Sequence, residues 1–151
     1  MMCGVFGNRL PRVGPREWNA QLDPHATAIV YAAGVPVHRS IGLDVTCQVT
    51  MSAADVREAF RADLLHPVLD FAQVWFQRAD RITFHDPLAA TTIFDDAICS
   101  FERGQVDVEL ASPRLQGFLH WTPGGGTGPH EAAVMVDSAR FFEHFFGAFQ
   151  R

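Results

Sequence analysis

The stretch DPHATAIVYAAGVPVHRSIGLDV, residues 23–45, decides the fold that the sequence predicts. Asp23 followed by Pro24 is typical of an N-cap and the first position of a helix, and the apolar run that follows ends at Gly34. Residues 35–45 are rich in β-branched side chains and therefore favour a buried strand. A helix that leads directly into a strand indicates a fold of the α/β class.

The rest of the chain shows further helix and strand patterns. Ser52 with Asp55 three residues later resembles a capping box and predicts a helix to about residue 62. Apolar residues cover most of the circumference of a predicted helix over 67–79, which implies burial on more than one side. The remaining predictions are a loop over 1–22, a helix over 85–94, two strands between 98 and 121, a loop over 123–129, a strand over 132–136 and a helix over 138–149.

Composition and charge restrict the class of protein. The chain has 151 residues and 48% hydrophobic residues, which fits one domain with a real core. It carries 12 basic and 17 acidic residues, for a net charge of −5, so no basic face for a nucleic-acid partner is expected. Every one of the basic residues is arginine, which excludes Schiff-base chemistry and the lysine of a phosphate-binding loop.

The first residues, the apolar runs and the cysteines restrict the class of protein further. The first twelve residues, MMCGVFGNRLPR, do not have the apolar run of a signal peptide, and no stretch approaches the roughly 18 apolar residues of a membrane span. Cys3, Cys47 and Cys99 are odd in number and form no Cys-x-x-Cys pair. We therefore expect a cytoplasmic protein without a disulfide framework, a zinc ribbon or a membrane partner.

Two conspicuous patterns have structural interpretations. The glycine run over 124–128 fits no phosphate-binding register and predicts a loop. Phenylalanines recur at helical spacing on one broad face of the last predicted helix, which favours core packing over a ligand site. They are Phe141, Phe142, Phe145, Phe146 and Phe149.

Five short motifs follow one another in an order that carries a family resemblance. They are Glu17-Trp18-Asn19, Asp23-Pro24-His25-Ala26, Gly34-Val35-Pro36, Gly42-Leu43-Asp44-Val45-Thr46 and His85-Asp86-Pro87-Leu88-Ala89. In this order and spacing the chain resembles the nucleoside hydrolases, the inosine-uridine preferring N-ribohydrolases. The resemblance implies an open, Rossmann-like sheet with helices on both faces and a small β-hairpin region. It covers only the C-terminal half of the family's domain, so residues 1–151 are expected to form a single partial domain.

The resemblance also implies roles for individual residues. His85 matches the general acid that protonates the leaving base, and Asp86 matches a ligand of Ca²⁺. Glu17, Trp18 and Asn19 match the motif that holds the ribose hydroxyls, and Asn8 is the candidate for an upstream asparagine that also contacts the sugar. These residue types suit cleavage of an N-ribosidic bond, in which positive charge develops on the ribose and negative charge on the base. At an ordinary pKa near ~6.5, His85 would supply a proton near neutral pH.

Departures from the family pattern leave two hypotheses open. The family's N-terminal Asp-x-Asp-x-x-x-Asp-Asp cluster and its mid-chain threonine have no counterpart, Asp95-Asp96 is an isolated pair, and Cys47 replaces a usual histidine or arginine. Since Ca²⁺ takes about 6–8 oxygen ligands, Asp86 alone cannot complete its site. Either the chain acts on a ribonucleoside together with a complementary N-terminal half, or it is a catalytically inert fragment or binding subunit. The sequence also leaves open whether the chain forms a homo-oligomer. An unrelated α/β domain is a poor explanation for so many motifs in the family's order.

Overall fold

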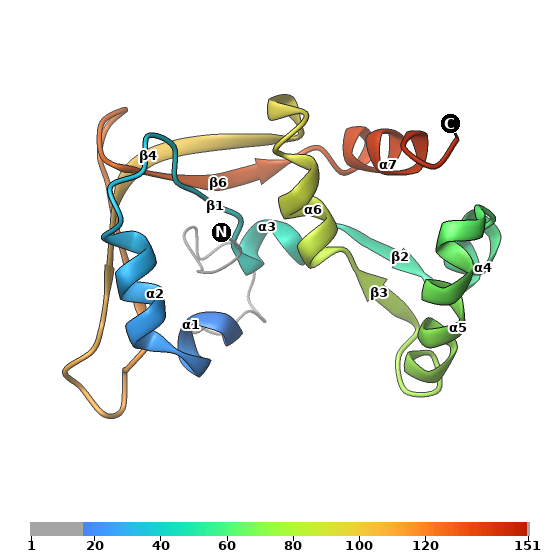
Figure 1. Cartoon of the computed structure of the whole chain (residues 1–151), viewed down its shortest axis with the longest axis horizontal. Coiled ribbons are helices and arrows are strands. Elements are labelled where there is room, and N and C mark those ends of the chain that lie inside the picture. The colour runs from blue at the N-terminus through green and yellow to red at the C-terminus, as the bar shows by residue number, and fades with distance from the viewer. Residues whose placement is uncertain (1–16, 151) are drawn as a thin grey trace.

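A four-stranded sheet organises the computed structural model, which describes residues 17–150 (Figure 1). Its strands lie in the order β1-β6-β4-β5. β4 pairs antiparallel with both β5 and β6, whereas the short β1 lies parallel to β6. The strands are β1 (Arg39–Ser40), β4 (Cys99–Val108), β5 (Leu119–Pro123) and β6 (His130–Val136). The α/β prediction is confirmed, and the two strands expected between residues 98 and 121 are β4 and the start of β5.

Two short helices open the described part of the chain. α1 (Trp18–Leu22) leads into α2 (Pro24–Tyr31). The carboxylate of Asp23 accepts a hydrogen bond from the Ala26 amide at 2.8 Å, which satisfies one of the free donors at the start of α2. Gly34 follows this helix with a φ of 62°, a backbone conformation that suits glycine. The predicted helix with a marked beginning and end is therefore confirmed.

The strand predicted over residues 35–45 is wrong over most of its length. β1 has only two residues, and the chain then turns into α3 (Leu43–Thr46). The carbonyl oxygen of Gly42 closes this turn by accepting hydrogen bonds from the amides of Val45 and Thr46 at 3.1 and 3.0 Å. α3 packs against β6. This tertiary packing overrides the preference for a strand that the β-branched composition indicates.

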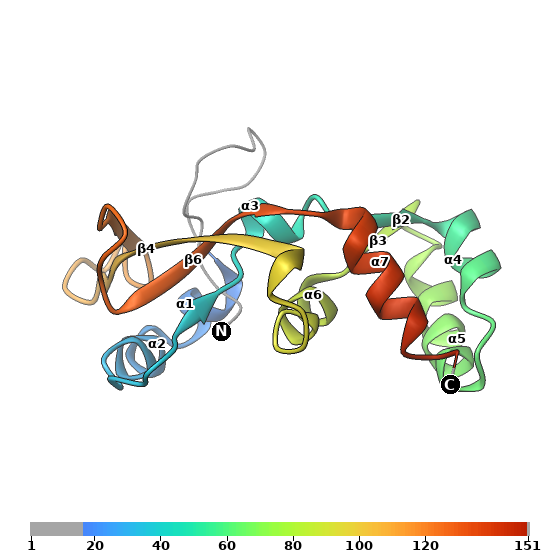
Figure 2. The same ribbon diagram turned by 90° about the horizontal axis from the view of Figure 1, so that it is seen from above.

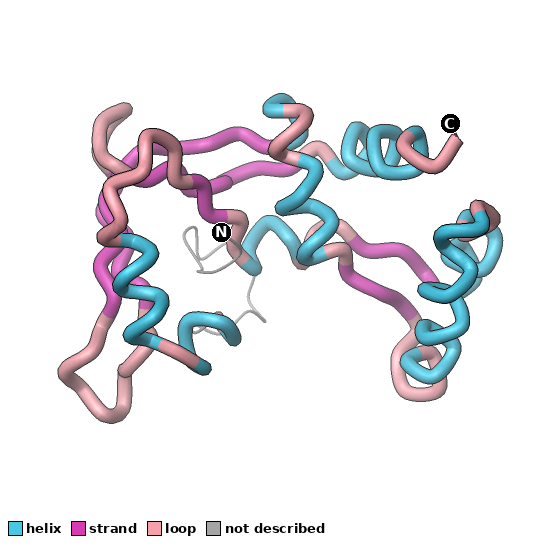
Figure 3. The backbone as a smooth tube through the Cα atoms, in the orientation of Figure 1, coloured by secondary structure: helices cyan, strands magenta, loops and turns pink. Residues whose placement is uncertain are grey.

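A second, two-stranded sheet carries a helical arm. β2 (Thr50–Ser52) pairs antiparallel with β3 (Arg81–Thr83). Between these strands lie α4 (Ala53–Ala59), a 3₁₀ helix (Asp63–Leu65) and α5 (His66–Trp75). Figures 1 and 2 both place α4 and α5 at the end of the molecule away from α1 and α2. The arm gives the molecule the extended shape that is also visible in the backbone tube of Figure 3. Strands of three residues are too short for alternation to predict them.

The phenylalanine face of the last helix packs into the main core, as the sequence predicts. This helix is α7 (Ser138–Gly147), and α6 (His85–Thr91) packs beside it. The ring of Phe84, just before α6, lies 5.2–5.6 Å from three rings of α7, those of Phe141, Phe142 and Phe145. The buried members of this core are Ile41, Val45, Val49, Val56, Phe60, Leu65, Phe84, Leu88, Ile98, Cys99, Ala133 and Phe141.

A smaller cluster attaches the N-terminal helices to the sheet. Ala20 of α1 and Tyr31 of α2 pack with Val106 of β4 and Leu119 of β5. The segment that carries Glu17 and Asn19 is therefore held by β4 and β5, whereas α6 is held by the main core. These two packing neighbourhoods position the two groups of candidate site residues.

The apolar face of α5 contradicts the burial expected for it. The sequence predicts burial on more than one side, but Ala72 is its only buried residue. Phe71, Val74 and Trp75 are 79%, 66% and 59% exposed. Hydrophobicity shows that a helix face is costly to hydrate, but it does not show which element covers that face.

The glycine-rich loop and the connecting helices complete the description. The loop joins β5 to β6, and three of its glycines have positive φ, at Gly125, Gly126 and Gly128. This confirms the predicted loop over residues 124–129, whereas Pro123 is the last residue of β5. A second 3₁₀ helix spans Asp96–Ile98. Among residues 17–150, no helix has the length and apolar character needed to cross a membrane.

Candidate active site

His85 and Thr46 come together from two segments that are 39 residues apart in the sequence. His85 Nδ1 lies 2.7 Å from Thr46 Oγ1, which is hydrogen-bonding distance. Thr46 is completely buried at the end of α3, and His85 is half-buried at the start of α6. The structure therefore joins the two most specific motifs of the sequence through one hydrogen bond.

Burial changes the proton chemistry of His85. Desolvation lowers the pKa of its imidazole from the ordinary value, and the neighbouring negative charge of Asp86 opposes this only in part. The ordinary pKa expected from the sequence is therefore corrected downward. At neutral pH the free protein favours the uncharged imidazole, so proton donation requires a step that first charges the ring.

Asp86 lies in the first turn of α6 with its side chain exposed to solvent. Within residues 17–150, no three His, Cys, Asp or Glu side chains gather closely enough to hold a metal ion. The isolated pair Asp95-Asp96 is engaged elsewhere, because Asp95 binds Arg140 at 2.7 Å and Asp96 binds Arg39 at 2.5 Å. The described residues therefore do not fit a complete Ca²⁺ site.

Glu17 has a structural task that the sequence did not reveal. Its carboxylate caps α1, with Oε2 accepting hydrogen bonds from the amides of Asn19 at 2.8 Å and Ala20 at 3.2 Å. The residue is only 3% exposed, and this burial raises the pKa of its carboxyl while the amide hydrogen bonds oppose the rise. Glu17 therefore stabilises the backbone of the segment to which the sugar-binding role was assigned.

The other candidates for sugar binding lie at the surface or outside the described chain. Trp18 is 69% exposed, and Asn19 is exposed beside it in α1. Asn8 lies outside the described residues. α1 packs on α2, whereas α6 packs on α3 and α7. The structure thus brings His85 and Asp86 together with Thr46 and holds the α1 residues in a separate packing neighbourhood.

The sequence interpretation missed two buried polar residues of the GLDVT motif. Thr46 meets His85, and Asp44 is only 3% exposed within α3. The following residue, Cys47, is a half-buried free thiol whose pKa is raised by burial. One signal in the sequence could have identified them. Both residues are polar and lie in a segment that the sequence predicts to be buried, and buried polar groups need hydrogen-bond partners.

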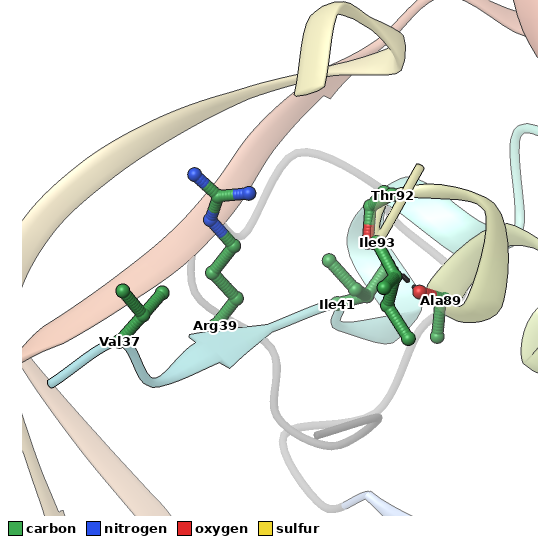
Figure 4. Close-up of a pocket in the computed structure, with 6 residues that line it drawn as sticks. All are labelled: Val37, Arg39, Ile41, Ala89, Thr92 and Ile93. Carbon is green, nitrogen blue, oxygen red and sulfur yellow. Dashed lines mark hydrogen bonds between the residues drawn. The ribbon is translucent and has the colours of Figure 1, made fainter. Parts of the chain in front are cut away.

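A groove runs along the open edge of the main sheet, between β1 and the end of α6 (Figure 4). Its volume is about 350 Å³, and its lining residues are Val37, Arg39, Ile41, Ala89, Thr92 and Ile93. Val37 and Ile93 are 59% and 77% exposed. Arg39 contributes charge at this edge, and its guanidinium contacts Glu131 and Asp96. The groove therefore combines exposed apolar side chains with a strand edge that no described strand covers.

Comparison with known proteins identifies the family. Residues 1–143 match the family model described as inosine-uridine preferring nucleoside hydrolase. The chain is 31% identical over 149 residues to the pyrimidine-specific ribonucleoside hydrolase of Salmonella enteritidis, and the match covers 90% of this chain and 46% of that protein. The chain thus spans about half the length of the relatives it matches.

Solved structures agree with this result. The purine-preferring ribonucleoside hydrolase from Gardnerella vaginalis has a TM-score of 0.75 at 23% identity, covering 95% of this chain and 48% of that one. The inosine-uridine preferring nucleoside hydrolase from Bacillus anthracis has a TM-score of 0.67 at 26% identity, with the same two coverages. The predicted fold class is confirmed by these neighbours, and the chain belongs to the inosine-uridine preferring nucleoside hydrolase family.

Proposed function

We propose that this chain takes part in hydrolysis of the N-ribosidic bond of ribonucleosides, which yields ribose and the free base. The observation that carries the proposal is the pair His85–Thr46 beside Asp86, formed by the two motifs most specific to the family. Departure of the base leaves negative charge on a base nitrogen, and a proton donor at that position stabilises the transition state. His85 is the proposed donor.

Glu17, Trp18 and Asn19 are the proposed ribose-binding residues, with Asn8 as a further contact. Glu17 caps α1 through Oε2, and its other carboxylate oxygen is the proposed acceptor for a ribose hydroxyl. The exposed ring of Trp18 would lie against the sugar as positive charge develops on it. An asparagine amide can both donate to and accept from sugar hydroxyls.

We propose Ca²⁺ as the cofactor of the complete enzyme, with Asp86 as one ligand. Because no three or more His, Cys, Asp or Glu side chains gather at one place among the described residues, the other ligands would come from a segment beyond residues 17–150. The chain by itself is then expected to bind Ca²⁺ weakly and to show no turnover. Calorimetric titration of the chain with Ca²⁺ tests the first expectation directly.

A complementary N-terminal half is the proposed partner, and the groove along β1 is its proposed contact. Two observations support this: relatives of the family are about twice as long as this chain, and the open edge of β1 is bordered by exposed Val37 and Ile93. A strand added to this edge would extend the sheet and cover both side chains. In this arrangement, residues 1–151 would supply the C-terminal half of the domain.

The competing function is that of an inert fragment or binding subunit, favoured by the absence of a metal-ligand group among the described residues. A chimeric protein distinguishes the nucleosidase function from the inert alternative. This chain would replace the matching part of the Salmonella enteritidis relative, and ribose release from inosine and uridine would be measured with and without Ca²⁺. We expect turnover in the chimera, at least 10-fold lower turnover in its His85→Ala variant, and none from the isolated chain. A folded chimera without turnover would support the inert alternative.

A further inference from the structure

The contact between Thr46 and His85 joins a fixed hydroxyl to a ring nitrogen. Thr46 has no exposed surface, and its backbone amide and carbonyl are both hydrogen-bonded, to Gly42 and Val49 at 3.0 Å each. β-branched side chains have few allowed rotamers, so a buried threonine holds its hydroxyl in one place. The 2.7 Å contact is therefore made to a rigid partner.

The backbone on the His85 side is equally well anchored. The amide of Phe84 donates to the carbonyl oxygen of Val49 at 2.9 Å, and the Phe84 ring packs against Phe141. Since the backbone is fixed at Thr46 and next to His85, the orientation of the imidazole depends only on the side-chain torsions of His85. The hydrogen bond to Thr46 selects among these orientations.

We propose that Thr46 is a positioning residue for His85: its hydroxyl holds Nδ1 and thereby makes Nε2 the nitrogen that faces the leaving base. This inference rests on the nucleosidase function proposed above. Before the transfer, Nε2 takes up a proton from water, which charges the ring. In the transfer, the Nε2–H bond breaks, the proton moves to a nitrogen of the base, and the electron pair of that bond stays on Nε2. Nδ1–H continues to donate to Thr46 Oγ1 throughout.

A hydroxyl suits this task better than a carboxylate. It carries no charge, so it does not hold the second proton on the ring as an aspartate would. Its oxygen accepts from Nδ1–H both when the ring is charged and when it is neutral. The ring therefore keeps its orientation through the whole cycle of charging and proton release. Nδ1–H is the neutral ring state that fits this role, because it donates to Thr46 Oγ1 and leaves Nε2 free to take up and release the proton given to the base.

Nitrogen-15 NMR of the His85 ring tests the inference without turnover. At a fixed pH of about 8, where imidazole is neutral, the shifts of Nδ1 and Nε2 report which nitrogen carries the proton. We expect Nδ1–H in the unmodified chain, a shift toward Nε2–H in Thr46→Val and Thr46→Ala, and the original pattern in Thr46→Ser. Thr91→Val is the matched control, because Thr91 is also nearly buried and donates to the Leu88 carbonyl within α6.

Ring shifts that are the same with and without the hydroxyl would overturn the inference, as would an Nε2–H ring in the unmodified chain. In the active chimera we expect Thr46→Val to lower kcat about 10-fold or more with little change in KM, and Thr46→Ser to retain activity. Because the NMR result needs no activity, the positioning role can fail while the nucleosidase proposal stands. An inactive chimera with the expected ring state would contradict only the proposed function.

Discussion

His130 Nε2 lies 2.9 Å from the carbonyl oxygen of Tyr31, and this contact ties the last residue of α2 to the first residue of β6. Nδ1 of the same ring lies 3.0 Å from the amide nitrogen of Val106, which can only donate. Nδ1 must therefore be the acceptor, and the ring proton must lie on Nε2, where it is donated to Tyr31. One neutral histidine thus connects α2, β4 and β6.

Replacing His130 by alanine is expected to destabilise the fold by about 2–4 kcal/mol, because it leaves the Val106 amide and the Tyr31 carbonyl without their buried partner. Urea unfolding followed by circular dichroism measures the change. His120→Ala is the matched control, since this histidine is more than half exposed and its substitution should cost less than about 0.5 kcal/mol. Equal losses of unfolding free energy in the two variants would contradict the proposed role of His130 in connecting α2, β4 and β6.

His38 is expected to make the fold sensitive to acid. Burial and the nearby His130 lower the pKa of its imidazole, and its Nε2 has no hydrogen-bond partner in the part of the chain that the structure describes. The unfolded chain, with a pKa near about 6.5, therefore takes up a proton before the folded chain does. Stability falls as the pH drops below about 6.5 toward the lower folded pKa.

The variant His38→Phe tests this dependence. It keeps a ring against Tyr31, where His38 stacks at 4.7 Å, and removes the titrating group. We expect a shallower loss of unfolding free energy between about pH 6.5 and 5 than in the unmodified chain. Parallel pH profiles for the two proteins would show that another group is responsible.

Glu17→Gln separates the capping role of this residue from its proposed contact with ribose. Glutamine keeps a carbonyl oxygen for the amides of Asn19 and Ala20, so the fold should lose less than about 1 kcal/mol, whereas Glu17→Ala should lose about 0.5–2 kcal/mol. In the chimera, Glu17→Gln should raise KM because it removes the charge offered to the sugar. An unchanged KM would remove Glu17 from the ribose site.

The pH dependence of Glu17 has the opposite sign to that of an ordinary surface carboxylate. Because burial raises its folded pKa, the folded chain holds the proton of this carboxyl more strongly than the unfolded chain does. Its contribution to stability is complete below the unfolded pKa of about 4.3 and is lost as the pH rises through the folded value. Unfolding titrations of Glu17→Gln should therefore show less of this loss with rising pH.

The exposed face of α5 is expected to promote association of the isolated chain. Phe71 and Trp75 are 79% and 59% exposed on a helix that buries only Ala72. Phe71→Ser should lower the apparent mass in light scattering at high concentration and leave the melting temperature unchanged within about 1 °C, because exposed side chains contribute little to stability. Association that persists in this variant would place the contact elsewhere.

Part of the fold could be predicted because its signals are local. Two helix caps are examples: Asp23 accepts from the Ala26 amide, and Ser52 accepts from the Asp55 amide at 3.1 Å. Each cap binds an amide three residues further along the chain, so a short stretch of sequence is enough to predict it. The short β1 could not be predicted, because strand length depends on pairing with β6 and β-branched composition does not encode that partner.

The sequence by itself determined the family, the beginnings of α2, α4, α6 and α7 and the phenylalanine face of α7, since all of these are read from neighbours along the chain. It also predicted His85 and Asp86 as site residues. Only the tertiary structure decided that Thr46 would meet His85, that Glu17 would cap α1 and that the apolar face of α5 would stay exposed. The physical reason is that residue type reports the cost of hydrating a side chain, whereas its partner is set by packing between distant segments.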